Sequence, residues 1–130
     1  MFQQPLVWIR IRKGFEKSVL DELKLKEIIS FQSTENALGF APAIPLTALE
    51  SYLKGHFEIQ DLSSQQTLSL LPDNCGQRMW DCCSGSGGKT LLLADRFQKA
   101  AFLLTDLRTS SLQNAEERLK KAAVRNYKTM

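Results

Sequence analysis

The sequence has few of the residues that support disulfide, metal or membrane chemistry. It contains three cysteines, two of them adjacent, and a single histidine, so it holds neither a disulfide framework nor a C-x-x-C metal pair. No apolar run is long enough to span a bilayer, and the N-terminus lacks the profile of a signal peptide. These features favour a protein of the reducing cytoplasm.

An excess of charge is also missing. The formal net charge is +3 over 130 residues, which permits binding to RNA without indicating it. The hydrophobic content of 43% and the charged content of 24% are ordinary for a globular protein, so disorder is not indicated. The length allows one modest domain, or a small domain followed by part of a larger one.

The most informative segment is residues 79–90, MWDCCSGSGGKT, which a leucine-rich stretch follows. An apolar run ending in an acid, then a glycine-rich turn and a helical pattern, predicts a strand, a tight loop and a helix N-terminus. Glycines let the backbone turn sharply and let a ligand approach it closely. The unpaired amides and the positive dipole end of the helix then face that ligand.

Spacing separates three classes of ligand for such a loop. A phosphate loop, G-x-x-x-x-G-K-[ST], accounts for residues 88–90 but needs a glycine where Cys83 stands. The dinucleotide pattern G-x-G-x-x-G begins at Gly85 and Gly87 but meets a threonine at its last glycine. The third pattern is an acid at the strand end, three residues and then G-x-G, as in S-adenosylmethionine-dependent methyltransferases. Asp81, Gly85 and Gly87 match it fully.

A second acid supports the adenosine-type patterns. Residues 101–106 read as a second strand ending in Asp106, near the interval of about 20 residues expected after the loop. A carboxylate there can accept hydrogen bonds from both ribose hydroxyls, and no phosphate is needed. The alternative is a glycine-rich turn with two solvated acids. It does not explain why both acids, the glycines and the two predicted strands all stand at the positions that one binding pattern requires.

Two segments resemble a known family. Residues 81–90 are similar to motif I of the RNA (cytosine-5) methyltransferases of the Sun/Fmu type, D-x-C-A-A-P-G-G-K-T, with Ser84-Gly85-Ser86 in place of Ala-Ala-Pro. Residues 55–65 resemble the upstream motif of that family, G-x-F-x-x-Q-D-x-S-S-Q. The resemblance covers the chain well from residue 55 onward and only loosely over residues 1–54.

The resemblance implies a fold, a cofactor and a partner. The expected fold is α/β, a Rossmann-like class I methyltransferase of which the chain holds the first strands. The expected cofactor is S-adenosylmethionine, and the expected partner is RNA, with ribosomal RNA as the favoured substrate. Asp81 is expected to brace the loop, and Lys89 to face the cofactor carboxylate or the target base. The residues expected to bind the cofactor are Cys83, Ser84, Gly85, Ser86, Gly87, Gly88, Lys89 and Asp106.

No catalytic residue is assigned. Methylation at carbon 5 of cytosine needs a cysteine thiolate that adds to carbon 6, and the family carries its two cysteines after the fourth and fifth strands. By spacing, Cys83 lies on the cofactor loop, Cys82 is expected to point into the sheet, and Cys75 precedes the first strand. We therefore expect the N-terminal portion of a longer methyltransferase, inactive by itself.

Residues 1–54 are expected to form a small α+β unit that helps to grip RNA in the family, and residues 55–130 the first part of the methyltransferase domain. The patterns predict strands at 6–12, 28–31 and 37–40, with helices after Gly14 and at Pro45. The first strand is expected to bury its aliphatic face. Its other face carries Trp8, Arg10 and Arg12, and we expect it to be solvated, with the tryptophan covering a neighbouring element. The alternative is that these side chains stack on bases and hold phosphates.

The second part of the chain is predicted in the same way. A capping box at Ser63 opens a helix, residues 78–83 form the first strand of the sheet, and the next helix, 90–97, buries Leu92 and Leu93. An amphipathic helix with a solvated basic side follows Asp106, and a third strand begins at Tyr127.

Two other functions remain open on the sequence: a P-loop-like nucleotide-binding protein, and a non-catalytic RNA-binding module. A methyltransferase that acts on another substrate is also compatible with these residues. The oligomeric state is not indicated.

Overall fold

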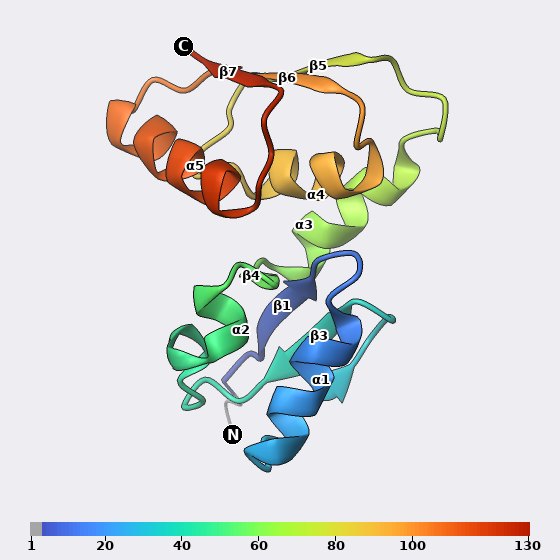
Figure 1. Cartoon of the computed structure of the whole chain (residues 1–130), viewed down its shortest axis with the longest axis vertical. Helices are drawn as coiled ribbons and strands as arrows, with labels where there is room; N and C mark the ends of the chain where they lie inside the picture. Colours follow the sequence, from blue (N-terminus) through green and yellow to red (C-terminus); the bar gives the residue numbers. More distant parts are fainter. Residues whose placement is uncertain (1–3) are drawn as a thin grey trace. The chain divides into compact units, whose positions relative to one another are not determined.

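The computed structural model describes residues 4–130 and divides the chain after Gln65 into two compact units. Each unit contains its own sheet and helices (Figure 1). Helix α3 (Leu62–Thr67) runs across the division. Strand β4 (Phe57–Ile59) pairs with a strand of the first unit, so residues 55–65 group there, beyond the boundary after residue 54 that the sequence suggested. Among the described residues, no helix is long and apolar enough to cross a membrane.

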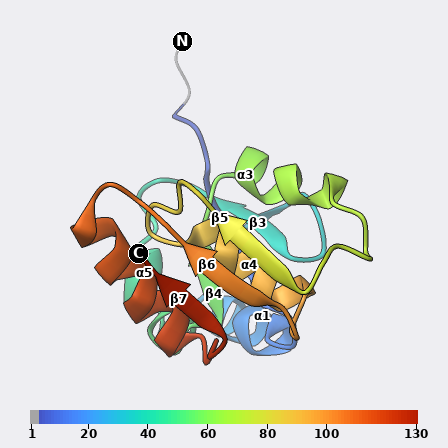
Figure 2. The same ribbon diagram turned by 90° about the horizontal axis from the view of Figure 1, so that it is seen from above.

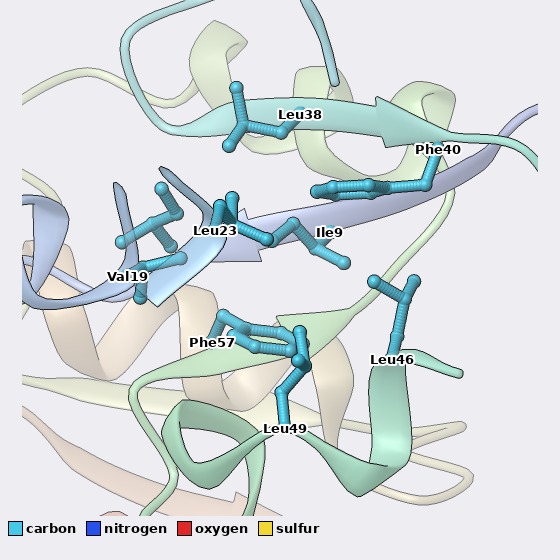
Figure 3. Packing of buried hydrophobic residues seen from close by; sticks show 9 residues of the cluster. Ile9, Val19, Leu23, Leu38, Phe40, Leu46, Leu49 and Phe57 are labelled. Carbon is cyan, nitrogen blue, oxygen red and sulfur yellow. The ribbon is translucent and has the colours of Figure 1, made fainter. Parts of the chain in front are cut away.

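The first unit is an antiparallel sheet packed against short helices. Its strands are β1 (Val7–Ile11), β2 (Phe31–Gln32), β3 (Ala37–Phe40) and β4, in the order β2-β3-β1-β4. The helices are α1 (Glu16–Leu25), η1 (Leu46–Ala48) and α2 (Glu50–Leu53). Their apolar side chains converge on one face of the sheet, where Val19 and Leu23 of α1 meet Ile9 and Phe57 (Figure 3). Ile9 and Phe57 are at most 1% exposed, which makes this the core of the unit.

The opposite face of this sheet is not solvated, contrary to the prediction. Arg10 and Arg12 of that face are only 4% and 9% exposed. Burial of a guanidinium requires polar partners, and the Arg10 Nε donates a hydrogen bond of 3.2 Å to Gln60 Oε1. Arg10 also stands opposite the buried Glu58 in the β1–β4 register. The prediction for Trp8 is confirmed, because its indole lies against β3 where Gly39 leaves room.

The second short strand also differs from its prediction. Strand β2 begins at Phe31, where the expected strand 28–31 ends. The Ile28 N–H instead donates to Leu23 O at the end of α1, after Glu27 adopts a left-handed φ of 55°. Ile28 therefore closes the helix and packs against the core, and only then does the chain extend.

The second unit is a parallel sheet with helices on one face. Strands β5 (Arg78–Asp81), β6 (Ala101–Leu104) and β7 (Tyr127–Thr129) lie in that order (Figure 2). Helix α4 (Gly88–Arg96) joins β5 to β6, and α5 (Thr109–Lys121) joins β6 to β7. Because such crossovers are right-handed, two successive steps in one direction place both helices on the same face, as Figure 1 shows. The three predicted strands are present, although β5 and β6 end at Asp81 and Leu104, two residues before the predicted ends.

Two helices differ in detail from their predictions. Helix α3 begins at Leu62, one residue before Ser63, and continues as η2 (Leu68–Leu70). In α4 the fully buried leucine is Leu91, whereas Leu92 and Leu93 are half-buried. The helix begins at Gly88, two residues earlier than expected.

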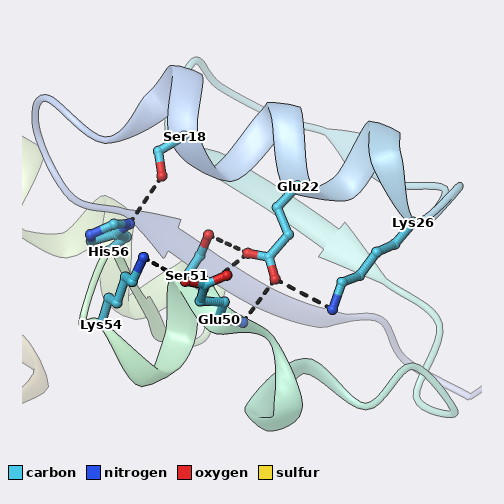
Figure 4. Close-up of polar contacts among 7 residues, drawn as sticks. All are labelled: Ser18, Glu22, Lys26, Glu50, Ser51, Lys54 and His56. Carbon is cyan, nitrogen blue, oxygen red and sulfur yellow. Dashed lines mark hydrogen bonds and ion pairs between the residues drawn. The ribbon is translucent and has the colours of Figure 1, made fainter.

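A carboxylate on α1 caps the N-terminus of α2 (Figure 4). Glu22 accepts hydrogen bonds from the Glu50 N–H at 2.8 Å, from the Ser51 N–H at 2.9 Å and from the Ser51 hydroxyl. Its side chain is 13% exposed. Burial alone would raise the pKa of Glu22, but the hydrogen bonds from Ser51 and Glu50 and the nearby Lys26 hold it below the ordinary value of 4.5.

Replacement of Glu22 by Gln should therefore destabilise the first unit by about 1–2 kcal/mol, because a charged acceptor of three hydrogen bonds is lost. Since the folded-state pKa is lowered, the contribution is complete above the ordinary pKa of 4.5 and disappears as the pH falls through the lower folded value. Hydrogen exchange of the β1 amides should show the difference at neutral pH and its loss in acid. Asp21→Asn, at an exposed position of the same helix, is the control. Equal protection of wild type and Glu22→Gln at neutral pH would contradict the assignment.

Candidate cofactor site

The glycine-rich loop fills the space between β5 and α4. Gly85 and Gly87 have left-handed φ values of 51° and 83°, a conformation that favours glycine. The Gly87 N–H donates to Ser84 O at 2.9 Å and closes a turn, and Gly87 O accepts from the Leu91 N–H in the first turn of α4. The predicted loop thus leads directly into the helix N-terminus.

Gly87 is required for a second reason. A Cβ at this position would lie 3.1 Å from Ala115 Cβ and 3.4 Å from Ala115 Cα, in the middle of α5. Ala115 is fully buried, so it cannot move away. At Gly85, by contrast, a Cβ would meet nothing within 4 Å. The loop therefore presses against α5 at Gly87 and leaves Gly85 open.

The acid that follows β6 holds the loop. Asp106 Oδ2 accepts a hydrogen bond of 2.9 Å from the Gly85 N–H, and Oδ1 accepts one of 2.9 Å from the Arg108 N–H. The Asp106 side chain is 11% exposed. The Arg108 and Gly85 amides lower the pKa of Asp106 from its ordinary value, so the carboxylate stays charged near neutral pH.

The acid that ends β5 braces the helix. Asp81 Oδ2 accepts a hydrogen bond of 2.8 Å from the hydroxyl of Thr90, which is fully buried in the first turn of α4. A carboxylate beside a helix N-terminus also interacts favourably with the helix dipole. The Asp81 carbonyl continues the β5–β6 ladder by accepting from the Thr105 N–H at 2.9 Å.

The remaining predicted residues lie on the same loop with different exposure. Ser84 is buried, and its N–H donates to Thr105 O at 3.1 Å. Cys83 is exposed, and so is Lys89 in the first turn of α4. Cys82 is also exposed, so the expectation that it points into the sheet is wrong. The reason is that β5 ends at Asp81 and both cysteines belong to the turn that follows.

The comparisons with known proteins agree on one relationship. No protein-family model matches the chain. Ribosomal RNA small subunit methyltransferase B of Klebsiella pneumoniae is 26% identical over 128 residues, which cover 95% of this chain and 30% of that protein. The protein of the same name from an Escherichia coli strain is 25% identical over 128 residues.

Solved structures show the same fold. A methyltransferase homologue from Pyrococcus horikoshii aligns with a TM-score of 0.83 and 19% identity, covering 98% of this chain and 44% of its own. NSun6 from the same organism, solved with the S-adenosylmethionine analogue SFG, aligns with a TM-score of 0.81 and 16% identity, covering 97% and 57%.

The chain is related to the Sun/Fmu-type RNA methyltransferases. The resemblance inferred from the two motifs is thereby confirmed, as is the Rossmann-like fold class. The chain spans about 30% of the length of the curated relatives it matches.

One contact explains how the chain tolerates its departure from the Sun/Fmu motif. Arg118 of α5 donates two hydrogen bonds to Ser86, at 2.8 Å to the carbonyl and at 2.9 Å to the hydroxyl. Ser86 stands where the family motif has proline. A proline ring restricts the backbone by itself, without a contact from another helix. Arg118 belongs to the basic side of α5 that was predicted to be solvated, because no pattern within the helix indicates a contact with the loop.

Alanine at the two loop glycines should have unequal effects. Both substitutions place a side chain in the left-handed region, which costs about 1–2 kcal/mol. Gly87→Ala adds the collision with Ala115 and about 1–3 kcal/mol more. Chemical denaturation of the second unit should therefore rank wild type above Gly85→Ala and Gly85→Ala above Gly87→Ala. Equal destabilisation by the two variants would show that the loop does not press on α5.

Arg118→Gln should loosen the loop without unfolding the unit. Arg118 is a half-exposed charged donor, and loss of its hydrogen bonds should lower the free energy of local opening of the loop by about 1 kcal/mol. Hydrogen exchange at the loop amides should then be roughly threefold to tenfold faster. Mass-spectrometric exchange of the peptide that contains residues 84–88 measures this. Arg125→Gln, which removes the same charge from an exposed position, is the matched control and should leave the loop unchanged.

Proposed function

We propose that this chain is the cofactor-binding portion of an S-adenosylmethionine-dependent RNA (cytosine-5) methyltransferase that acts on ribosomal RNA. The observation that carries the proposal is the attachment of the glycine-rich loop to Asp106 through the Gly85 N–H. The names of the curated relatives support the reaction and the class of substrate.

Asp106 suits a nucleoside with two free ribose hydroxyls. A carboxylate offers about four lone-pair positions, and backbone amides of Gly85 and Arg108 occupy two of them. The Arg108 guanidinium also lies beside Oδ1, with Nε at 3.6 Å, and the vicinal hydroxyls would take the lone-pair positions that these groups leave. The fixed backbone partners also hold the carboxylate in one orientation before any ligand arrives.

The other end of the cofactor would meet the helix N-terminus. The first amides of α4 lack partners within the helix and favour an anionic group, and Lys89 adds an exposed positive charge in the same turn. We assign the carboxylate of the methionine part to this region. Cys83, Ser84, Ser86, Gly87 and Gly88 would line the path between it and the ribose with backbone groups.

The same contacts disfavour a nucleoside triphosphate. In a phosphate loop the backbone amides point at the phosphates, but here the Gly85 amide is already used by Asp106. The Asp106 carboxylate would also repel a polyphosphate placed on the loop. The P-loop-like function is therefore the weaker candidate, although residues 88–90 match that motif.

The chemistry supplied by S-adenosylmethionine, when it is bound, is an electrophilic methyl group. This chain would bind and orient the cofactor, and we assign no catalytic residue in it. Cys83 is a poor nucleophile because the neighbouring Cys82 raises the pKa of its thiol, with further contributions from Asp106 and Asp81. We expect the 130-residue chain to bind cofactor without methylating RNA by itself.

The first unit is proposed to assist RNA binding, as its place in the family resemblance implies. Arg10 and Arg12 are buried and so are not the groups that would contact phosphates. The exposed cations of this unit, such as Lys13 and Lys17, are better placed for that role.

Calorimetric titration with S-adenosylhomocysteine and with ATP–magnesium tests the proposal. Wild type should bind the first and not the second. Asp106→Ala should weaken binding of S-adenosylhomocysteine by roughly tenfold or more, because charged hydrogen bonds to the ribose and the attachment of the loop are both lost. Asp21→Ala, an exposed acid of the first unit, should bind like wild type. Binding of ATP alone would overturn the family function for this site.

A further inference from the structure

Two cysteines lie side by side on the turn after β5. In a strand, successive side chains point to opposite faces, but β5 ends at Asp81, and Cys82 and Cys83 form the turn that follows. Both are exposed. Because the two residues are neighbours in the chain and both lie on one exposed turn, a single ligand can reach both sulfurs.

The backbone beneath the two thiols is held in place. The Thr105 hydroxyl donates to Cys82 O at 3.3 Å, and the Ser84 N–H donates to Thr105 O at 3.1 Å. These bonds lie on either side of Cys83 and attach the turn to the end of β6. The thiol pair is therefore presented by a fixed support.

The donor set selects the class of ligand. Soft thiols bind soft, thiophilic acceptors and are poor ligands for hard cations that require oxygen. Among residues 4–130, no group of three or more His, Cys, Asp or Glu could hold a metal ion, so the pair offers two donors and no third. The pair therefore suits an atom that forms two bonds to sulfur and needs no third protein donor. Trivalent arsenic that carries one organic group is such an atom.

We propose that Cys82 and Cys83 form a dithiol site for monosubstituted trivalent arsenicals. In the reaction, each sulfur forms a bond to arsenic, and the oxygen of the arsenoxide leaves as water with both thiol protons. Arsenic remains trivalent and neither sulfur is oxidised, so no oxidant is needed.

Phenylarsine oxide and intact-mass spectrometry test the site on the folded 130-residue chain. Wild type should take up one arsenical, which resists an excess of a monothiol and is removed by a vicinal dithiol reagent. Cys82→Ser and Cys83→Ser should each release the arsenical to the monothiol roughly tenfold faster or more, because the second bond is intramolecular only when both thiols are present. Cys75→Ser, which removes the third cysteine, should behave like wild type. Release from wild type as fast as from the single-serine variants would overturn the proposal.

A second consequence rests on the proposed function. Cys83 and Ser84 belong to the loop assigned to S-adenosylmethionine, so the arsenical adduct should lower the affinity for S-adenosylhomocysteine at least tenfold, and a dithiol reagent should restore it. A chain that retains the arsenical but never binds S-adenosylhomocysteine would refute the proposed function alone. A chain that binds S-adenosylhomocysteine but loses the arsenical to a monothiol would refute the dithiol site alone.

Discussion

The hydrogen bond between the Gly85 N–H and the Asp106 carboxylate is the contact on which the second unit depends. Parallel strands that are neighbours end at the same edge of a sheet, so an acid that follows β6 lies beside the loop that follows β5. The carboxylate converts this proximity into a fixed geometry. Without it, Gly85 would lose its attachment to the acid after β6, although the loop would keep its bonds to Thr105, the bonds of Arg118 to Ser86 and the contact of Gly87 with α5.

Under the proposed function, this contact also selects the ligand of the loop. It uses a backbone donor that a phosphate would need, and it places a negative charge where a phosphate would lie. At the same time it leaves lone pairs on a carboxylate whose orientation is fixed. A loop built in this way favours neutral hydroxyl donors, although its glycines and the following Lys89 and Thr90 look like those of a phosphate loop.

Local patterns were enough to predict the strands of the second unit, the loop and Asp106, because spacing along the chain determines them. They failed where a partner comes from far away in the sequence. Arg118 reaches Ser86 across 32 residues, and Arg10 meets Gln60 across 50. In both cases an alternating or helical pattern placed a charged residue on the polar side, which for an isolated element means solvent. Only tertiary packing shows that this side is occupied.

The two motifs that revealed the family perform different physical tasks. In the upstream motif, the Gln65 side chain donates to Ile9 O and to Gln60 O, and the Gln60 side chain accepts from Arg10. These amides attach the segment to β1, and such bonds depend on the length of each side chain. The loop motif instead requires a particular backbone conformation, which more than one type of residue can adopt. Ser86 can therefore replace proline once Arg118 holds it from α5.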